Sequence, residues 1–280
     1  MKRIIATLVI LCILSACQHK QQVTVPISTI DSTLQTNATA ILESKLSEIN
    51  AQSGQVVVME VQTGQIKALV GLTKKDSTNY QSCENFSVWQ STGLMHPISL
   101  LAALETGKVK LSDKVDTGNG IYQIHGRELK DHNWHRGGYG ELTVQEGLAA
   151  SSNIATYKTM EKAFGDNPQT FFDLLANMSY GKPDSINGIA NLNPAYFVTP
   201  KDNNWAKSDF AWSSIGYNQQ ISPIQILTFY NAIANDGKMI QPQLYKDSVV
   251  VINPQIASRV SIDSLKKALV FNITDRKSVV

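Results

Sequence analysis

The side chains of this sequence that could do chemistry are concentrated in three short segments, residues 92–97, residues 131–135 and Ser151-Ser152-Asn153. Thr92 and His96 are four residues apart. On a helix they would share one face, where a hydroxyl and an imidazole can meet as nucleophile and base. A simpler interpretation makes His96 a neutral polar residue that lines a pocket.

The middle segment contains His132 and His135, three residues apart and next to Asp131, which are potential metal ligands. No third or fourth ligand follows at a spacing typical of zinc sites. The favoured interpretation is a polar loop beside a substrate, within a stretch, residues 108–140, that is predicted to be loop-like throughout. We therefore predict no metal and no other cofactor.

A central helix is predicted directly after His96. Pro97 suits a first helical turn, where its missing N–H would be unpaired anyway. A mostly apolar run follows, with Ile98, Leu100, Leu101 and Leu104. Such a surface is typical of a helix in the middle of a core.

Another helix is predicted to position Ser151-Ser152-Asn153. Thr143-Val144-Gln145-Glu146 has the pattern of a capping box, in which the threonine accepts from an amide three residues on and the glutamate reaches back. The short helix that starts there delivers Ser151-Ser152-Asn153 to a turn. Helices over residues 154–164 and 169–180, each closed by a glycine, would wall the site.

Three further elements follow from local patterns. Apolar residues at spacings of three and four predict an amphipathic helix up to about Asn50. Residues 56–70 predict a β-hairpin with a tight turn, and because two strands alone are not stable in water, the sheet must be completed elsewhere. Ser222 as cap and Pro223 at the first helical position predict a helix to Asp236.

The composition excludes one class of function. The chain has 280 residues, of which 42% are hydrophobic and 17% are charged, as in a globular protein with one large core or two modest ones. Its formal net charge is only +2. Because no dense basic cluster alternates with aromatic residues, nucleic-acid binding is excluded.

Several motifs, taken together, point to one family. They are Thr29-Ile30-Asp31, the hairpin over residues 54–70, Leu142-Thr143-Val144 with Ser151-Ser152-Asn153, Gly216-Tyr217, and Ser222-Pro223-Ile224-Gln225. In this order and spacing, residues 28–272 resemble the transpeptidase domain of penicillin-binding proteins, close to the high-molecular-weight class B type.

The resemblance implies an α/β (α+β) fold shared with serine β-lactamases, in which an antiparallel sheet is flanked by helices. It also implies a reaction in peptidoglycan synthesis: a serine attacks the D-Ala-D-Ala end of a stem peptide, releases D-alanine and passes the acyl group to an amine. β-Lactams mimic that dipeptide. Ser151 would relay protons to the leaving group, while Asn153 and Tyr217 would bind the substrate.

The sequence departs from this family at the first motif. That motif is Ser-x-x-Lys-Pro, and aligning its proline with Pro97 puts Gly93 at the nucleophile position and His96 at the lysine position. Glycine has no oxygen to acylate, so impaired catalysis is expected, with β-lactams bound non-covalently at most. A Thr92–His96 pair is a weaker alternative, because Thr92 lies one residue before the nucleophile position.

The second departure is at the C-terminus. The family's Lys-Thr-Gly strand, two later strands and a closing helix have no counterpart, so the domain over residues 29–274 is expected to be incomplete. Residues 275–280 match the translation of a common sequencing-library adapter, which predicts an artefactual tail. Without those strands we expect residues 98–104 to face water on one side and the chain to be poorly stable.

The N-terminus predicts export. Lys2 and Arg3 precede an apolar run over residues 4–13, and Leu14-Ser15-Ala16-Cys17 resembles a bacterial lipobox. Residues 1–16 are therefore expected to be a lipoprotein signal peptide, Cys17 the lipidated first residue, and residues 17–28 a tether. An ordinary signal peptide is the alternative. We expect a membrane-anchored protein that faces the periplasm or the cell exterior.

Two other functions stay open from the sequence. One is a non-catalytic lipoprotein that uses Ser151 and Asn153 to bind peptidoglycan or to scaffold cell-wall enzymes. The other is a hydrolase or sensor similar to a class D β-lactamase. The hydrolase is disfavoured because it also needs the serine and the lysine, and because residues 29–35 resemble a transpeptidase opening.

Overall fold

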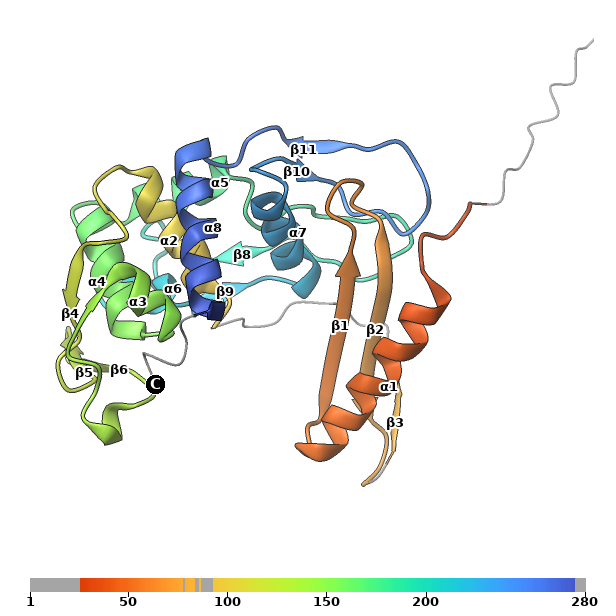
Figure 1. Ribbon diagram of the computed structural model, residues 1–280, viewed down its shortest axis with the longest axis horizontal. Coiled ribbons are helices and arrows are strands. Elements are labelled where there is room, and N and C mark those ends of the chain that lie inside the picture. The colour runs from red at the N-terminus through yellow and green to blue at the C-terminus, as the bar shows by residue number, and fades with distance from the viewer. Residues whose placement is uncertain (1–25, 78, 84–85, 87–92, 275–280) are drawn as a thin grey trace, which may run out of the picture.

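The computed structural model describes residues 26–77, 79–83, 86 and 93–274 (Figure 1). The predicted signal peptide, Cys17, Thr92 and residues 275–280 lie outside these ranges. Figure 1 shows a long hairpin with one helix against it at one end of the molecule and a group of helices at the other. Within the ranges described, no helix has the length and apolar character needed to span a membrane.

The first part of the molecule is a helix packed on an antiparallel sheet. Helix α1 (Ser32–Glu48) begins at Asp31, whose side chain accepts the N–H of Leu34. Strands β1 (Ser53–Met59), β2 (Ile66–Lys74) and β3 (Tyr80–Ser82) form the sheet in that order. Six buried residues join helix and sheet, namely Ala38, Leu42 and Leu46 of α1 with Ala68, Val70 and Leu72 of β2. The hairpin prediction is confirmed, and a third strand, which the sequence analysis missed, extends it.

The turn of this hairpin is held by a segment from the other end of the chain. Gly64 has a φ of +72°, and a Cβ added there would lie 2.4 Å from the carbonyl oxygen of Gln241. The N–H of Gln243 donates to Gly64 O at 2.8 Å, and the N–H of Ile66 donates to Gln243 O at 2.8 Å. The turn therefore needs glycine both for its backbone conformation and for this close approach.

Helix α2 (Met95–Glu105) is the centre of the larger core, as predicted. Ile98 and Leu101 are 0% exposed. Helix α8 (Arg259–Thr274) lies alongside α2 in Figure 1 and contributes Leu265, also 0% exposed, to the same core. The expectation that residues 98–104 face water on one side is wrong for most of this run, because residues 98–103 are buried and α8 packs against α2.

The stretch predicted to be loop-like contains short strands. β4 (Lys114–Asp116) pairs with β7 (Glu141–Thr143), and β5 (Ile121–Ile124) pairs with β6 (Arg127–Lys130); a 3-10 turn, η1 (Trp134–Arg136), follows. The loop prediction was wrong here. Each of these strands has only three or four residues, too few for an alternating pattern to stand out.

The helices around α2 begin where their caps predicted. In α3 (Val144–Ala149) both bonds of the capping box are present, with Glu146 N to Thr143 Oγ1 at 3.2 Å and Thr143 N to Glu146 Oε2 at 2.7 Å. The remaining elements are α4 (Asn153–Phe164), α5 (Gln169–Asn177), β8 (Tyr196–Phe197), α6 (Asp209–Ser214), β9 (Gln219–Gln220), α7 (Pro223–Ala234), β10 (Met239–Ile240) and β11 (Val251–Asn253). The predicted class, a mixed α/β fold with antiparallel sheets flanked by helices, is confirmed.

Candidate functional site

Three of the residues singled out from the sequence meet at one point. His96 lies in the first turn of α2 and is only 4% exposed. Its Nε2 is 3.1 Å from Asn153 Oδ1, and its Nδ1 is 3.3 Å from Ser151 Oγ. Asn153 is the first residue of α4, and Ser151 stands exposed two residues before it. The turn that follows α3 therefore contacts the first turn of α2 through His96.

The hydrogen bonds around Asn153 determine which nitrogen of His96 carries the proton. Asn153 Nδ2 is 2.8 Å from the carbonyl oxygen of Lys130, which can only accept. The Asn153 amide must therefore direct its NH₂ toward Lys130 and its oxygen toward His96, so His96 Nε2 donates. In the neutral imidazole Nδ1 is then the acceptor, and the Ser151 hydroxyl donates to it.

Burial keeps this imidazole neutral. Desolvation lowers the pKa of His96 to about 4, although the hydrogen bond with Asn153 acts in the opposite direction. At neutral pH the residue therefore carries no charge. In this it differs from a lysine, whose side chain would bring a cation to the same place unless burial also suppressed its charge.

A buried carboxylate holds the turn in place. Asp131 is 1% exposed and accepts from Ser152 Oγ at 2.8 Å and from Ile154 N at 3.0 Å. Burial is the main reason that the pKa of Asp131 is raised, and these hydrogen bonds oppose the rise. From the sequence, Asp131 was interpreted as a potential metal ligand or, preferably, as part of a polar loop beside a substrate. Its positioning role was missed, because residues 131 and 152 come together only in the folded chain.

The two histidines near Asp131 have separate partners. The hydroxyl of Tyr139 is 3.0 Å from His132 Nε2, and the His135 ring lies edge-on to Trp134 with 6.1 Å between centroids. In the part of the chain that the structure describes, no three His, Cys, Asp or Glu side chains gather as a metal-binding set.

The other two predicted site residues lie at different places. Gly93 is exposed just before α2, and a Cβ added to it would meet no atom within 4 Å. Tyr217 follows α6, and its exposed ring packs edge-on against Trp212, with 5.6 Å between centroids. The contacts described for Tyr217 do not include His96, Ser151 or Asn153.

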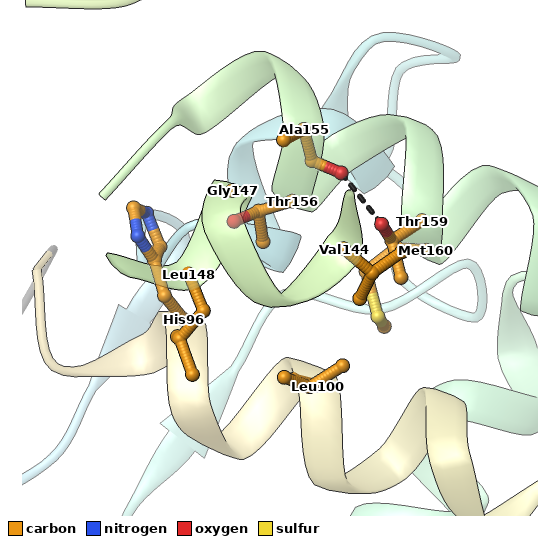
Figure 2. A pocket seen from close by; sticks show the side chains of 9 residues that line it. All are labelled: His96, Leu100, Val144, Gly147, Leu148, Ala155, Thr156, Thr159 and Met160. Carbon is orange, nitrogen blue, oxygen red and sulfur yellow. Dashed lines mark hydrogen bonds between the residues drawn. The ribbon is translucent and has the colours of Figure 1, made fainter. Parts of the chain in front are cut away.

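The space on the inner side of His96 is small. Figure 2 shows the imidazole extending from α2 toward α3 and α4, above a cavity lined mainly by apolar side chains, among them Leu100, Leu148 and Met160. The cavity has a volume of about 10 Å³. That is the space of roughly one water molecule, so any larger ligand must approach His96 from the exposed side, where Ser151 lies.

Comparison with known proteins gives consistent matches. Residues 54–272 match the family described as the penicillin binding protein transpeptidase domain. The chain is 28% identical over 244 residues to the probable peptidoglycan D,D-transpeptidase PbpC of Pseudomonas aeruginosa, covering 82% of this chain and 41% of that protein. It is 24% identical over 251 residues to the peptidoglycan D,D-transpeptidase FtsI of Escherichia coli K12, covering 86% of this chain and 40% of that protein. The chain thus spans about two fifths of the length of these relatives.

Solved structures show the same fold. A peptidoglycan glycosyltransferase from Burkholderia ambifaria superposes with a TM-score of 0.72 at 25% identity, covering 86% of this chain and 72% of the other. The transpeptidase domain of Burkholderia pseudomallei penicillin-binding protein 3 gives a TM-score of 0.71 at 24% identity, covering 87% and 69%. Since the family match runs from the first strand of the hairpin to the last turn of α8, this chain belongs to the penicillin-binding protein transpeptidase family of peptidoglycan synthesis.

Proposed function

We propose that this domain recognises D-Ala-D-Ala stem peptides of peptidoglycan at the turn formed by Ser151 and Asn153, without forming an acyl-enzyme at residue 93. β-Lactams, which mimic the dipeptide, bind there non-covalently. The observation that carries this proposal is the pairing of Gly93, which has no hydroxyl, with a buried neutral His96 at the lysine position. The serine nucleophile of the family's first motif and the lysine one turn later are both absent from the sequence.

The remaining hydrogen-bonding capacity of the turn suits a peptide. Asn153 uses one N–H on the carbonyl of Lys130 and one lone pair on His96. An amide side chain has a second N–H and a second lone pair, so Asn153 can still bind a substrate amide. Ser151 is exposed and offers an oxygen beside it.

Peptide binding can be measured directly on the full-length chain. We expect a diacetyl-Lys-D-Ala-D-Ala peptide to bind, and Asn153→Ala to weaken the affinity roughly 10-fold, since a hydrogen bond contributes about 1 kcal/mol and stranded partners add to the loss. The peptide with L-Ala at its C-terminus is the matched ligand control. Equal affinity of the original chain and Asn153→Ala would refute the assignment of this turn.

The missing nucleophile can be tested by restoring it. The space around Gly93 accepts a Cβ without a clash, so Gly93→Ser is compatible with the backbone, and His96→Lys adds the lysine of the family's first motif one turn later. We expect a fluorescent penicillin to label residue 93 in this double variant and not in the original chain. Failure of a folded double variant to be labelled would contradict the view that residues 93 and 96 are what prevents acylation there.

We also propose that the protein is exported and anchored by a lipid on Cys17, as the motif Leu14-Ser15-Ala16-Cys17 suggests. Lipidation should place the protein in the membrane fraction of expressing bacteria. Cys17→Ser should abolish labelling by an alkyne fatty acid and release the chain. Equal labelling of both forms would refute the anchor.

A further inference from the structure

The contacts of Ser151 resemble those of an activated nucleophile. We propose that Ser151 is itself a nucleophile, with His96 as its general base and Asn153 as the residue that orients the base, and that it forms an acyl-enzyme with activated carboxylic esters. This activity differs from transfer through the family's nucleophile position, and it does not depend on stem-peptide binding.

The direction of the hydrogen bonds suits this role for Ser151. The Lys130 carbonyl fixes the Asn153 amide, the amide fixes the His96 proton on Nε2, and the free lone pair of Nδ1 faces Ser151 Oγ at 3.3 Å. A nucleophile, a base and a third group that orients the base is the arrangement that activates serine hydroxyls. Distances in such pairs are often long before substrate binds and shorten in the complex.

The backbone of Ser151 independently supports this role. Its φ is +52°, a left-handed conformation that costs a non-glycine residue free energy. The turn is nevertheless held firmly: Ser151 N donates to Leu148 O at 3.0 Å, Ser152 N donates to Gly147 O at 2.9 Å, and Asp131 accepts from Ser152 Oγ and Ile154 N. A serine in place of the easier glycine puts an exposed hydroxyl next to the imidazole.

The reaction needs only Ser151, His96, the ester and water. Ser151 Oγ forms a bond to the ester carbonyl carbon while its proton passes to His96 Nδ1. The carbon–oxygen bond to the leaving alcohol then breaks, and the proton on His96 is available to that alcohol. Water, deprotonated in turn by His96, later releases the acid and regenerates Ser151.

The environment of His96 narrows the class of substrate. A base whose pKa is lowered to about 4 attracts a proton weakly, so efficient attack needs an electrophilic ester with a good leaving group. The cavity behind the imidazole holds about 10 Å³, so the acyl group must lie on the outer side, beside Ser151. Activated esters that bind on the outer side fit both conditions, and p-nitrophenyl acetate is the probe we choose.

The test compares two matched serines in the full-length chain. Ser151→Gly removes the hydroxyl and suits the φ of +52°, so the variant should fold. Ser179 is also a serine at positive φ, +60°, but its hydroxyl accepts from Asn253 Nδ2, and among the described residues no hydrogen bond joins it to a histidine, which makes Ser179→Gly the control. His96→Gln removes the base while keeping a donor toward Asn153.

We expect the protein-dependent release of p-nitrophenolate to fall about 100-fold or more in Ser151→Gly and in His96→Gln, the range of general-base effects, and to persist in Ser179→Gly. Mass spectrometry should place the acetyl group on Ser151. An unchanged rate in Ser151→Gly, or acetyl groups on other residues only, would overturn the inference. Peptide affinity, measured separately, distinguishes this failure from failure of the proposed stem-peptide binding.

Discussion

Replacing Asp131 tests whether one buried carboxylate holds the site together. Its oxygens accept from Ser152 Oγ and Ile154 N, which belong to residues that are 0% exposed. Asp131→Ala strands both donors. At about 1–3 kcal/mol for each buried unsatisfied group, the free energy of unfolding should fall by about 2–6 kcal/mol. Asp131→Asn keeps one acceptor oxygen and should cost about 1–3 kcal/mol.

The pH dependence of this effect has a defined sign. Burial raises the pKa of Asp131, so the folded state binds its proton more tightly than the unfolded state. The contribution of Asp131 to stability is therefore present in full below the unfolded pKa and is lost as pH rises through the folded pKa. Asp131→Asn cannot titrate, so the stability gap between the original chain and this variant should narrow from acid to neutral pH.

Urea denaturation followed by circular dichroism, over a pH series, measures both effects. Asp166→Asn is the control, because Asp166 is exposed and its replacement should change the unfolding free energy by less than about 0.5 kcal/mol. If Asp131→Asn proved as stable as the original chain at every pH, the hydrogen bonds would not be what holds the turn, and the reasoning would be refuted.

Three further substitutions test individual contacts, each by chemical denaturation. Leu265→Ala in α8 leaves a buried cavity and should lower the free energy of unfolding by about 2–5 kcal/mol. A loss below about 1 kcal/mol would contradict the packing of α8 on α2. Thr143→Ala breaks the capping box with Glu146 and should cost about 0.5–2 kcal/mol; no loss would mean the box is dispensable. Gly64→Ala puts a Cβ at a φ of +72° and against Gln241 O, so it should lower the free energy of unfolding by at least about 1 kcal/mol. A more stable variant would show that the turn can adapt.

Local signals in the sequence were sufficient for the elements that begin at caps. Thr143 and Glu146 predicted the start of α3, and Ser222-Pro223 predicted the start of α7. The end of α7 was predicted less well: the sequence predicted a helix to Asp236, whereas the structure ends the helix at Ala234. A cap depends on hydrogen bonds within a few residues, which is why starts were read well.

The sequence motifs were sufficient to predict the family, but only the structure shows how the site residues are arranged in space. Residue types and the family resemblance together singled out His96, Ser151 and Asn153, but spacing along the chain did not show that the two ring nitrogens of His96 contact Ser151 and Asn153. Nor did it show the function of Asp131, whose partners are more than twenty residues away.

The same division explains the error about the core. From its sequence α2 is an apolar helix that needs cover, and that much was determined locally. Which element covers it depends on packing between segments over a hundred residues apart, and the structure assigns this part to α8. Hydrogen-bonded turns and helix periodicity depend on neighbouring residues, so the sequence alone determines them. Burial, the position of a proton and contact between distant segments depend on the packing of the whole chain.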